Sequence, residues 1–76
     1  MNKQLTNFFI NPEILKWARI TIGYSFEMAA KKLGVDVEKL KKWEEGLEEA
    51  PIRKIRKFGE VYKRATTVFL LNNFLK

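Results

Sequence analysis

The residues of this chain that could do chemistry are charged side chains, and the densest group of lysines lies in LGVDVEKLKKWEEG, residues 33–46. Lys39, Lys41 and Lys42 stand there between two glycines. Lysine ammonium groups can donate to phosphate oxygens and to O6 and N7 of guanine. The same pattern is also typical of a helix whose polar face meets only water. The stretch therefore indicates either a nucleic-acid interface or a solvated face.

The chain lacks the residues on which most enzyme sites depend. It contains no Cys, so it has no thiolate nucleophile or thiolate metal ligand. It also contains no His, the commonest metal ligand and general base. One Ser and four Thr remain as nucleophiles, with no histidine to activate them. We therefore expect no enzymatic activity, no metal and no cofactor.

Length and composition predict one small folded domain. The chain has 76 residues, 46% of them hydrophobic, and ten of the residues are aromatic. The longest apolar run, residues 68–71, is far shorter than the ~20 residues of a membrane-spanning helix. We expect a soluble cytoplasmic protein that does not enter a membrane.

The net charge of +6 is concentrated in the last third of the chain. Residues 1–50 contain eight basic and eight acidic residues, whereas residues 51–76 contain seven basic residues and one acidic residue. A positive field of this kind favours nucleic acids or acidic partners, although a solvated basic face is the alternative.

Capping residues and glycines divide the chain into helices. The predicted N-caps are Asn11, Ser25 and Asp36, and the predicted stops are Gly23, Gly34 and Gly46. The predicted helices cover residues 12–22, 26–33, 37–45, 51–63 and a last segment from 66 or 67 to about 75.

The apolar spacing predicts which side of each helix faces the core. Around the short turn at Gly34, the inward residues are Ala29, Ala30, Leu33, Val35, Leu40 and Trp43. Along residues 51–63 they are Ile52, Ile55, Phe58, Val61 and Tyr62. Two short helices joined by a turn that contains glycine are typical of a helix-turn-helix.

The segment SFEMAAKKLGVDVEKLKKWEEG, residues 25–46, resembles the Cro/repressor (xenobiotic-response-element) family of helix-turn-helix domains. With WAR and VYKR added, residues 10–71 resemble the N-terminal domain associated with ImmA/IrrE-type metallopeptidases, without the peptidase. The resemblance implies an all-α, five-helix Cro/C1 repressor-like bundle over residues 11–76. Residues 1–10 would form an N-terminal extension, and the helix-turn-helix unit would cover about 25–46.

The resemblance also implies roles for individual residues. It implies a transcriptional regulator whose third helix enters the major groove of double-stranded DNA. The implied base-contacting residues are Val37, Glu38, Lys41 and Lys42, and the expected DNA-backbone contacts are Ser25, Lys39, Arg53, Lys54 and Lys57. The family often has an ion pair that joins the first helix to the end of the third, here Arg19 and Glu44.

The end of the chain carries more apolar residues than one helix packed on a small core can bury. Such an excess usually marks an interface. We therefore expect a homodimer whose interface contains Phe69, Leu70, Phe74 and Leu75. A dimer would place two recognition helices about 34–36 Å apart on the DNA.

Two departures from the family pattern support an alternative function. Phe26 stands where the family often has a Gln that contacts phosphate and steadies the recognition helix, and Phe26 is expected to do neither. Four acidic residues, Glu44, Glu45, Glu48 and Glu49, follow the recognition helix. The alternative is a protein-interaction module with little sequence-specific DNA reading, such as an antitoxin or regulatory subunit bound to a toxin or peptidase-type regulator.

Overall fold

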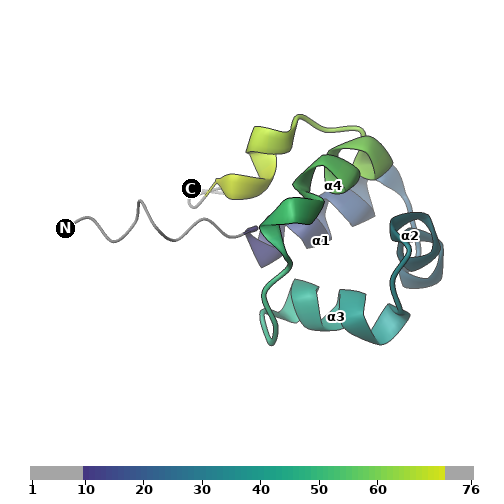
Figure 1. Ribbon diagram of the computed structural model, residues 1–76. Coiled ribbons are helices and arrows are strands. Elements are labelled where there is room, and N and C mark those ends of the chain that lie inside the picture. Colours follow the sequence, from purple (N-terminus) through teal and green to yellow (C-terminus); the bar gives the residue numbers. More distant parts are fainter. Residues whose placement is uncertain (1–9, 72–76) are drawn as a thin grey trace.

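The computed structural model describes residues 10–71, which form α-helices and short 3-10 helices and contain no β-strand. The elements in order are α1 (Pro12–Ile22), α2 (Phe26–Leu33), α3 (Val37–Glu45), η2 (Ile52–Lys54), α4 (Ile55–Tyr62) and η3 (Thr66–Leu70). Figure 1 shows α3 along one side of the molecule, with α1 and α4 opposite it and α2 closing one end. The chain is therefore all-helical over the described residues.

The first three helices begin and end where the sequence predicts. Asn11 Oδ1 accepts a hydrogen bond from the Glu13 N–H at 2.9 Å, and Ser25 Oγ accepts one from the Met28 N–H at 3.0 Å. Asp36 occupies the N-cap of α3, but its side chain makes no capping hydrogen bond. The three predicted stop glycines follow the helices with φ of 75° to 88°, a left-handed conformation that suits glycine.

The last third of the chain differs from the prediction. A single helix over residues 51–63 is wrong, because the first turn is the 3-10 helix η2 and α4 begins only at Ile55. A 3-10 helix has three residues per turn, so it breaks the α-helical period from which the inward face was derived. Ile52 accordingly lies 41% exposed instead of facing the core. Thr66 begins η3, and the predicted end of the last helix near residue 75 lies outside the described residues.

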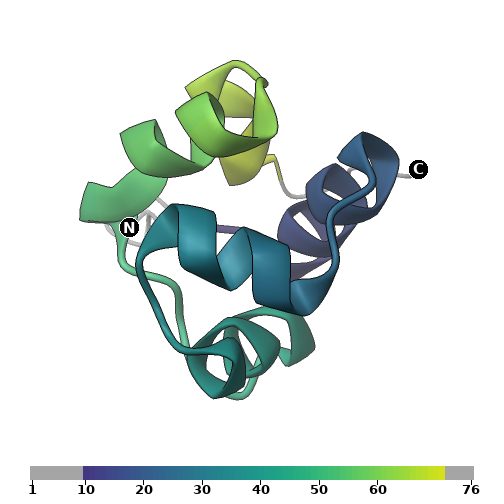
Figure 2. The same cartoon turned by 90° about the vertical axis from the view of Figure 1, so that its right-hand side faces the viewer.

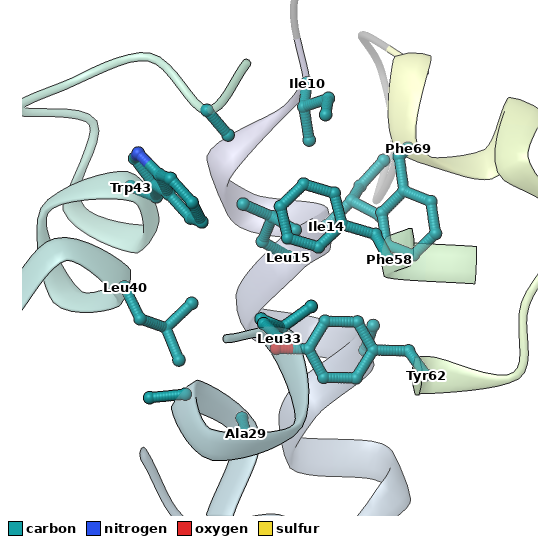
Figure 3. Close-up of a cluster of buried hydrophobic side chains, with 13 residues drawn as sticks. Ile10, Ile14, Leu15, Ala29, Leu33, Leu40, Trp43, Phe58, Tyr62 and Phe69 are labelled. Carbon is teal, nitrogen blue, oxygen red and sulfur yellow. The ribbon is translucent and has the colours of Figure 1, made fainter. Parts of the chain in front are cut away.

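The core is built around α1, which packs against α3, α4 and η3, while α2 packs against α3 and α4. Figure 3 shows the side chains of these elements meeting in one cluster. The Phe58 ring meets the Trp43 ring edge-on, with centroids 5.7 Å apart, and lies parallel to the Tyr62 ring at 6.4 Å. The buried apolar residues are Ile10, Ile14, Leu15, Ala18, Ala29, Ala30, Leu33, Leu40, Trp43, Ala50, Phe58, Tyr62 and Phe69.

Phe69 belongs to this core, so the prediction that it lies in a dimer interface is wrong. Its side chain is fully buried, with its ring centroid 5.9 Å from that of Phe58. The prediction assumed one long helix with too many apolar residues to bury, whereas the short η3 turns Phe69 inward. Leu70 is half-buried against the same cluster. Phe74 and Leu75 lie outside the described residues.

The two ends of the described chain meet beside the start of α1. The Asn11 N–H donates to the Phe69 carbonyl oxygen at 2.9 Å, and Asn11 Nδ2 donates to the Leu71 carbonyl oxygen at 2.6 Å. Ile10, which the sequence assigned to the N-terminal extension, is buried in the core. The folded unit therefore begins at least one residue earlier than predicted.

Helices α2 and α3 are separated by only three residues, 34–36. The Val35 N–H donates to the Ala30 carbonyl oxygen at 3.0 Å, which closes the end of α2 and turns the chain toward α3. Figure 2 looks onto α2, with α3 seen nearly end-on below it and α4 above. The buried sides of α2 and α3 share Ala29, Ala30, Leu33, Leu40 and Trp43 with the rest of the core. The outer side of α3 is left uncovered by any other described element.

Candidate nucleic-acid interface

The outward face of α3 is defined by the residues that the core does not use. Leu40, Trp43 and Glu44 are buried, so the opposite side of the helix carries Glu38, Lys42 and Glu45, all exposed. The centre of this face therefore has two carboxylates and one ammonium group. It can accept hydrogen bonds as well as donate them, which suits base edges better than a row of phosphates.

The four predicted base-contacting residues do not occupy equivalent positions. Glu38 and Lys42 are exposed on the outward face. Val37 is half-buried and packs against the core, so only its outer edge can touch a ligand. Lys41 is also half-buried, with Nζ 5.4 Å from the centroid of the Phe26 ring. Lys41 therefore lies at the margin of the face, on the side of α2.

The ion pair between Arg19 and Glu44 is present in the structure and links α1 to the end of α3. Arg19 Nε donates to Glu44 Oε2 at 2.8 Å, and Arg19 Nη2 donates to Glu44 Oε1 at 3.0 Å. Each residue is only 8% exposed. The two parallel bonds form the bidentate geometry in which Arg recognises a carboxylate most strongly. The pair fixes the orientation of α3 relative to α1.

Phe26 has a role at this site that the sequence did not reveal. The Arg19 guanidinium lies over its ring at 3.8 Å from the centroid, and the Lys41 ammonium lies 5.4 Å from the same centroid. The expectation that Phe26 cannot steady the third helix is therefore wrong. A cation over an aromatic face is attracted by the ring quadrupole, so Phe26 joins residues from α1 and α3. The replacement of the family's Gln by Phe at this position did not indicate that the ring would contact two cations.

Lys39 is joined to the acidic segment that follows α3. Its Nζ lies 2.7 Å from Glu48 Oε2, and the two side chains are 46% and 39% exposed. The hydrogen bond from Lys39 lowers the pKa of the Glu48 carboxyl below its ordinary value. A phosphate that approaches Lys39 would compete with this carboxylate. An exposed pair of this kind adds little stability and can be exchanged for another partner.

The remaining residues that were predicted to contact the DNA backbone are distributed over three elements. Ser25 is exposed at the N-cap of α2, where its Oγ already accepts the Met28 N–H. Arg53 and Lys57 are exposed on η2 and α4, and Lys54 is half-buried. The structure brings Lys39, Arg53 and Lys54 together around one surface depression, whereas Ser25 and Lys57 are not among its lining residues.

Other classes of site have little support in residues 10–71. No group of three His, Cys, Asp or Glu side chains in this range is close enough to hold a metal ion. None of the helices in the same range has the length and apolar composition that crossing a bilayer requires. The chain matches no protein-family model, no curated protein and no solved structure.

Proposed function

We propose that this chain is a small, non-enzymatic, cytoplasmic DNA-binding regulator that inserts α3 into the major groove of double-stranded DNA. In this proposal α2, residues 34–36 and α3 act as a helix-turn-helix of the Cro/repressor type. The supporting observation is that α3 is held rigidly on one side and uncovered on the other. The Arg19–Glu44 pair and the buried Leu40 and Trp43 hold it. A helix that reads bases needs this combination.

Individual residues of α3 and its surroundings would contact different parts of the DNA. Lys42 would donate to guanine and Glu38 would accept from the cytosine amino group, since both are exposed on the outward face. Lys41 and Val37 would contact the margin of the groove. Phosphate contacts would come from Lys39 on α3 itself, from Ser25 at the N-cap of α2, and from Arg53, Lys54 and Lys57 on η2 and α4.

A homodimer is part of the proposal, because paired recognition helices about 34–36 Å apart would match a pseudo-palindromic site. With Phe69 in the core of its own subunit, the candidate interface residues are Leu70, Phe74 and Leu75. Leu71, which is 47% exposed, extends this apolar group. Sedimentation of the full chain at several concentrations tests for the dimer.

The test of DNA binding is a mobility-shift series on the DNA upstream of the chain's own gene, at several salt concentrations. The logarithm of the affinity should fall linearly with the logarithm of salt, with a slope of about −0.9 per neutralised phosphate. The double variant Lys41→Ala/Lys42→Ala should bind more weakly and discriminate less between sequences, since a good base contact carries ~1–3 kcal/mol of discrimination.

The matched control is Lys16→Ala/Lys63→Ala, which removes the same charge at exposed positions of α1 and the end of α4. The control should bind almost as well as the unchanged chain. If the folded Lys41→Ala/Lys42→Ala variant keeps full affinity and specificity, α3 is not the reading helix.

A second function is favoured by the charges around α3. Glu38 and Glu45 flank Lys42 on the outward face, and Lys39 is paired with Glu48, so the attraction to phosphate is reduced. In this alternative the same scaffold binds a protein, such as a toxin or a peptidase-type regulator. Absence of DNA binding even at about 50 mM salt, where electrostatic attraction is strong, would favour this function.

A further inference from the structure

A surface depression of about 370 Å³ lies between α3 and the chain segment that leads into α4. Its walls come from residues 34–36 before α3, from Lys39 and Trp43 on α3, from Glu48, Glu49 and Pro51, and from Arg53 and Lys54 on η2. Its volume falls at the lower end of the ~300–1,000 Å³ that small-molecule sites occupy. The depression is on the side of α3 that carries Lys39, away from Phe26 and Lys41.

Trp43 lines the depression with a ring whose indole nitrogen is sealed from solvent. The residue is 3% exposed, and its indole Nε1–H has no hydrogen-bond partner among the described residues. Figure 3 shows this nitrogen on the side of the ring turned away from Leu15. A buried N–H without an acceptor is unfavourable, and indole can only donate, but this nitrogen exposes less than 1 Å², so a molecule in the depression does not contact it and Trp43 serves as a reporter of binding.

The charged groups around the depression are balanced in sign. Lys39 and Glu48 neutralise each other through their 2.7 Å contact. Asp36, Glu49, Arg53 and Lys54 make no side-chain hydrogen bond or ion pair with any residue in the described range. Two carboxylates and two cations therefore remain available. The two carboxylates would repel a purely anionic ligand, and Arg53 and Lys54 would repel a purely cationic one.

We propose that this depression binds a small zwitterion of the amino-acid or dipeptide class. The carboxylate of the ligand would lie toward Arg53 and Lys54, and its ammonium group toward Asp36 and Glu49. Each charged end would then gain charge-assisted hydrogen bonds, which are the stronger kind. The outward residues Glu38, Lys42 and Glu45 do not line the depression, so a ligand there would leave the base-reading face free. It would share Arg53 and Lys54 with the phosphate contacts proposed above.

The experiment is a titration of the ¹⁵N-labelled full chain with alanine and with dialanine, followed by NMR. The indole N–H signal of Trp43 should shift in a saturable way with at least one of the two probes, and the stronger binder identifies a free amino acid or a peptide as the ligand class. The indole signal of Trp17, which is not among the lining residues, is the internal reference. Acetate and methylammonium, added separately at the same ionic strength, should produce no saturable shift.

Two variants test the contacts, and both change exposed residues of the depression. Arg53→Gln and Glu49→Gln should each raise the apparent Kd for the zwitterion by roughly tenfold. Arg56→Gln, an exposed cation of α4 outside the depression, should leave it unchanged. The proposal is overturned if neither probe saturates the Trp43 signal, if acetate or methylammonium alone reproduces the shift, or if both lining variants bind like the unchanged chain.

Discussion

Arg19 makes more contacts than any other charged residue described above. Besides its two bonds to Glu44, it donates through Nη1 to the Tyr24 carbonyl oxygen at 3.1 Å and lies over the Phe26 ring. A buried charge is tolerated only where its donors are satisfied, and these contacts provide acceptors for most of them. Arg19 therefore connects α1, the start of α2 and the end of α3.

Glu44→Gln should destabilise the domain strongly. The neutral amide cannot accept both guanidinium bonds, so Arg19 would remain buried without its counter-charge, at a cost of ~3–5 kcal/mol. In a domain of this size such a loss lowers the melting temperature by more than about 10 °C. The control is Glu45→Gln, one residue along on the exposed side of α3. Equal, small losses in thermal melting of the two variants would mean that the pair contributes little.

Tyr62→Phe should leave the domain at least as stable as before at neutral pH. The Tyr62 hydroxyl is buried and has no hydrogen-bond partner among residues 10–71, so its removal relieves an unsatisfied group. In Tyr24→Phe, by contrast, a hydroxyl that donates to the Val61 carbonyl oxygen at 3.4 Å is lost. Thermal melting at pH 7 should therefore rank Tyr62→Phe above Tyr24→Phe. A clear loss of stability in Tyr62→Phe would indicate that the hydroxyl has a partner.

The same variant should alter the response to alkaline pH. Burial, assisted by the nearby Glu44 charge, raises the pKa of Tyr62 above its ordinary value. The fold thus favours the neutral phenol. The resulting contribution of Tyr62 to the free energy of unfolding is fully present below the unfolded pKa of ~10 and is lost as the pH rises above that value. The stability advantage of Tyr62→Phe should widen between about pH 9 and pH 11. A constant difference across that range would contradict the assignment.

At the scale of elements, α4 and the segment after it approach each other unusually closely at Gly59. A Cβ atom at this position would lie 2.9 Å from the Arg64 carbonyl oxygen and 3.1 Å from Thr66 Cγ2. The first of these atoms belongs to the backbone, so it cannot rotate away. The glycine therefore allows the chain to fold back from α4 into η3.

Gly59→Ala should destabilise the domain although alanine is the better helix former. Helix propensity alone would add ~0.5–1 kcal/mol of stability, but overpacking against a backbone costs ~1–3 kcal/mol, so the clash should prevail. Lys57→Ala, on an exposed position of the same helix, is the control and should change stability by less than about 0.5 kcal/mol. Denaturant unfolding measures both. An unchanged or higher stability for Gly59→Ala would show that η3 can move.

The sequence predicted elements well where local chemistry determines them. Asn11, Ser25 and the three stop glycines act on neighbouring residues, so the bounds of α1, α2 and α3 could be read from the chain. After residue 50 the predicted start signal was Pro51, but it precedes the 3-10 helix η2 and not an α-helix. The change from η2 to α4 and the inward turn of Phe69 depend on how the chain packs against α1, which apolar spacing alone does not contain.

The candidate site was predictable to a smaller extent. The exposure of Glu38 and Lys42 follows from the helical period, because Leu40 and Trp43 fix the opposite side. The contacts of Phe26 with two cations, and the pairing of Lys39 with Glu48, join residues whose spacing carries no periodic signal. The orphan N–H of Trp43 could not be inferred either, because it depends on the path of the loop beside it.

At the scale of the whole molecule, Asn11 joins the beginning of the fold to its end. Asn11→Ser should keep the cap, since serine caps helices as well as asparagine, but should lose the bond from Nδ2 to Leu71. Asn11→Ala should lose both. We expect denaturant unfolding to rank the unchanged chain first, the serine variant second and the alanine variant last, with steps of ~0.5–1.5 kcal/mol. Identical stabilities for the first two would mean that the link to Leu71 adds nothing.

The meeting of residues 11 and 71 also makes the domain a candidate for insertion engineering. A segment whose two ends lie within one hydrogen bond of each other can replace the tip of a surface loop in a host protein without forcing the host apart. Residues 10–71 could therefore be grafted as a cassette, or the ends could be joined and the chain reopened in the exposed segment around Leu47.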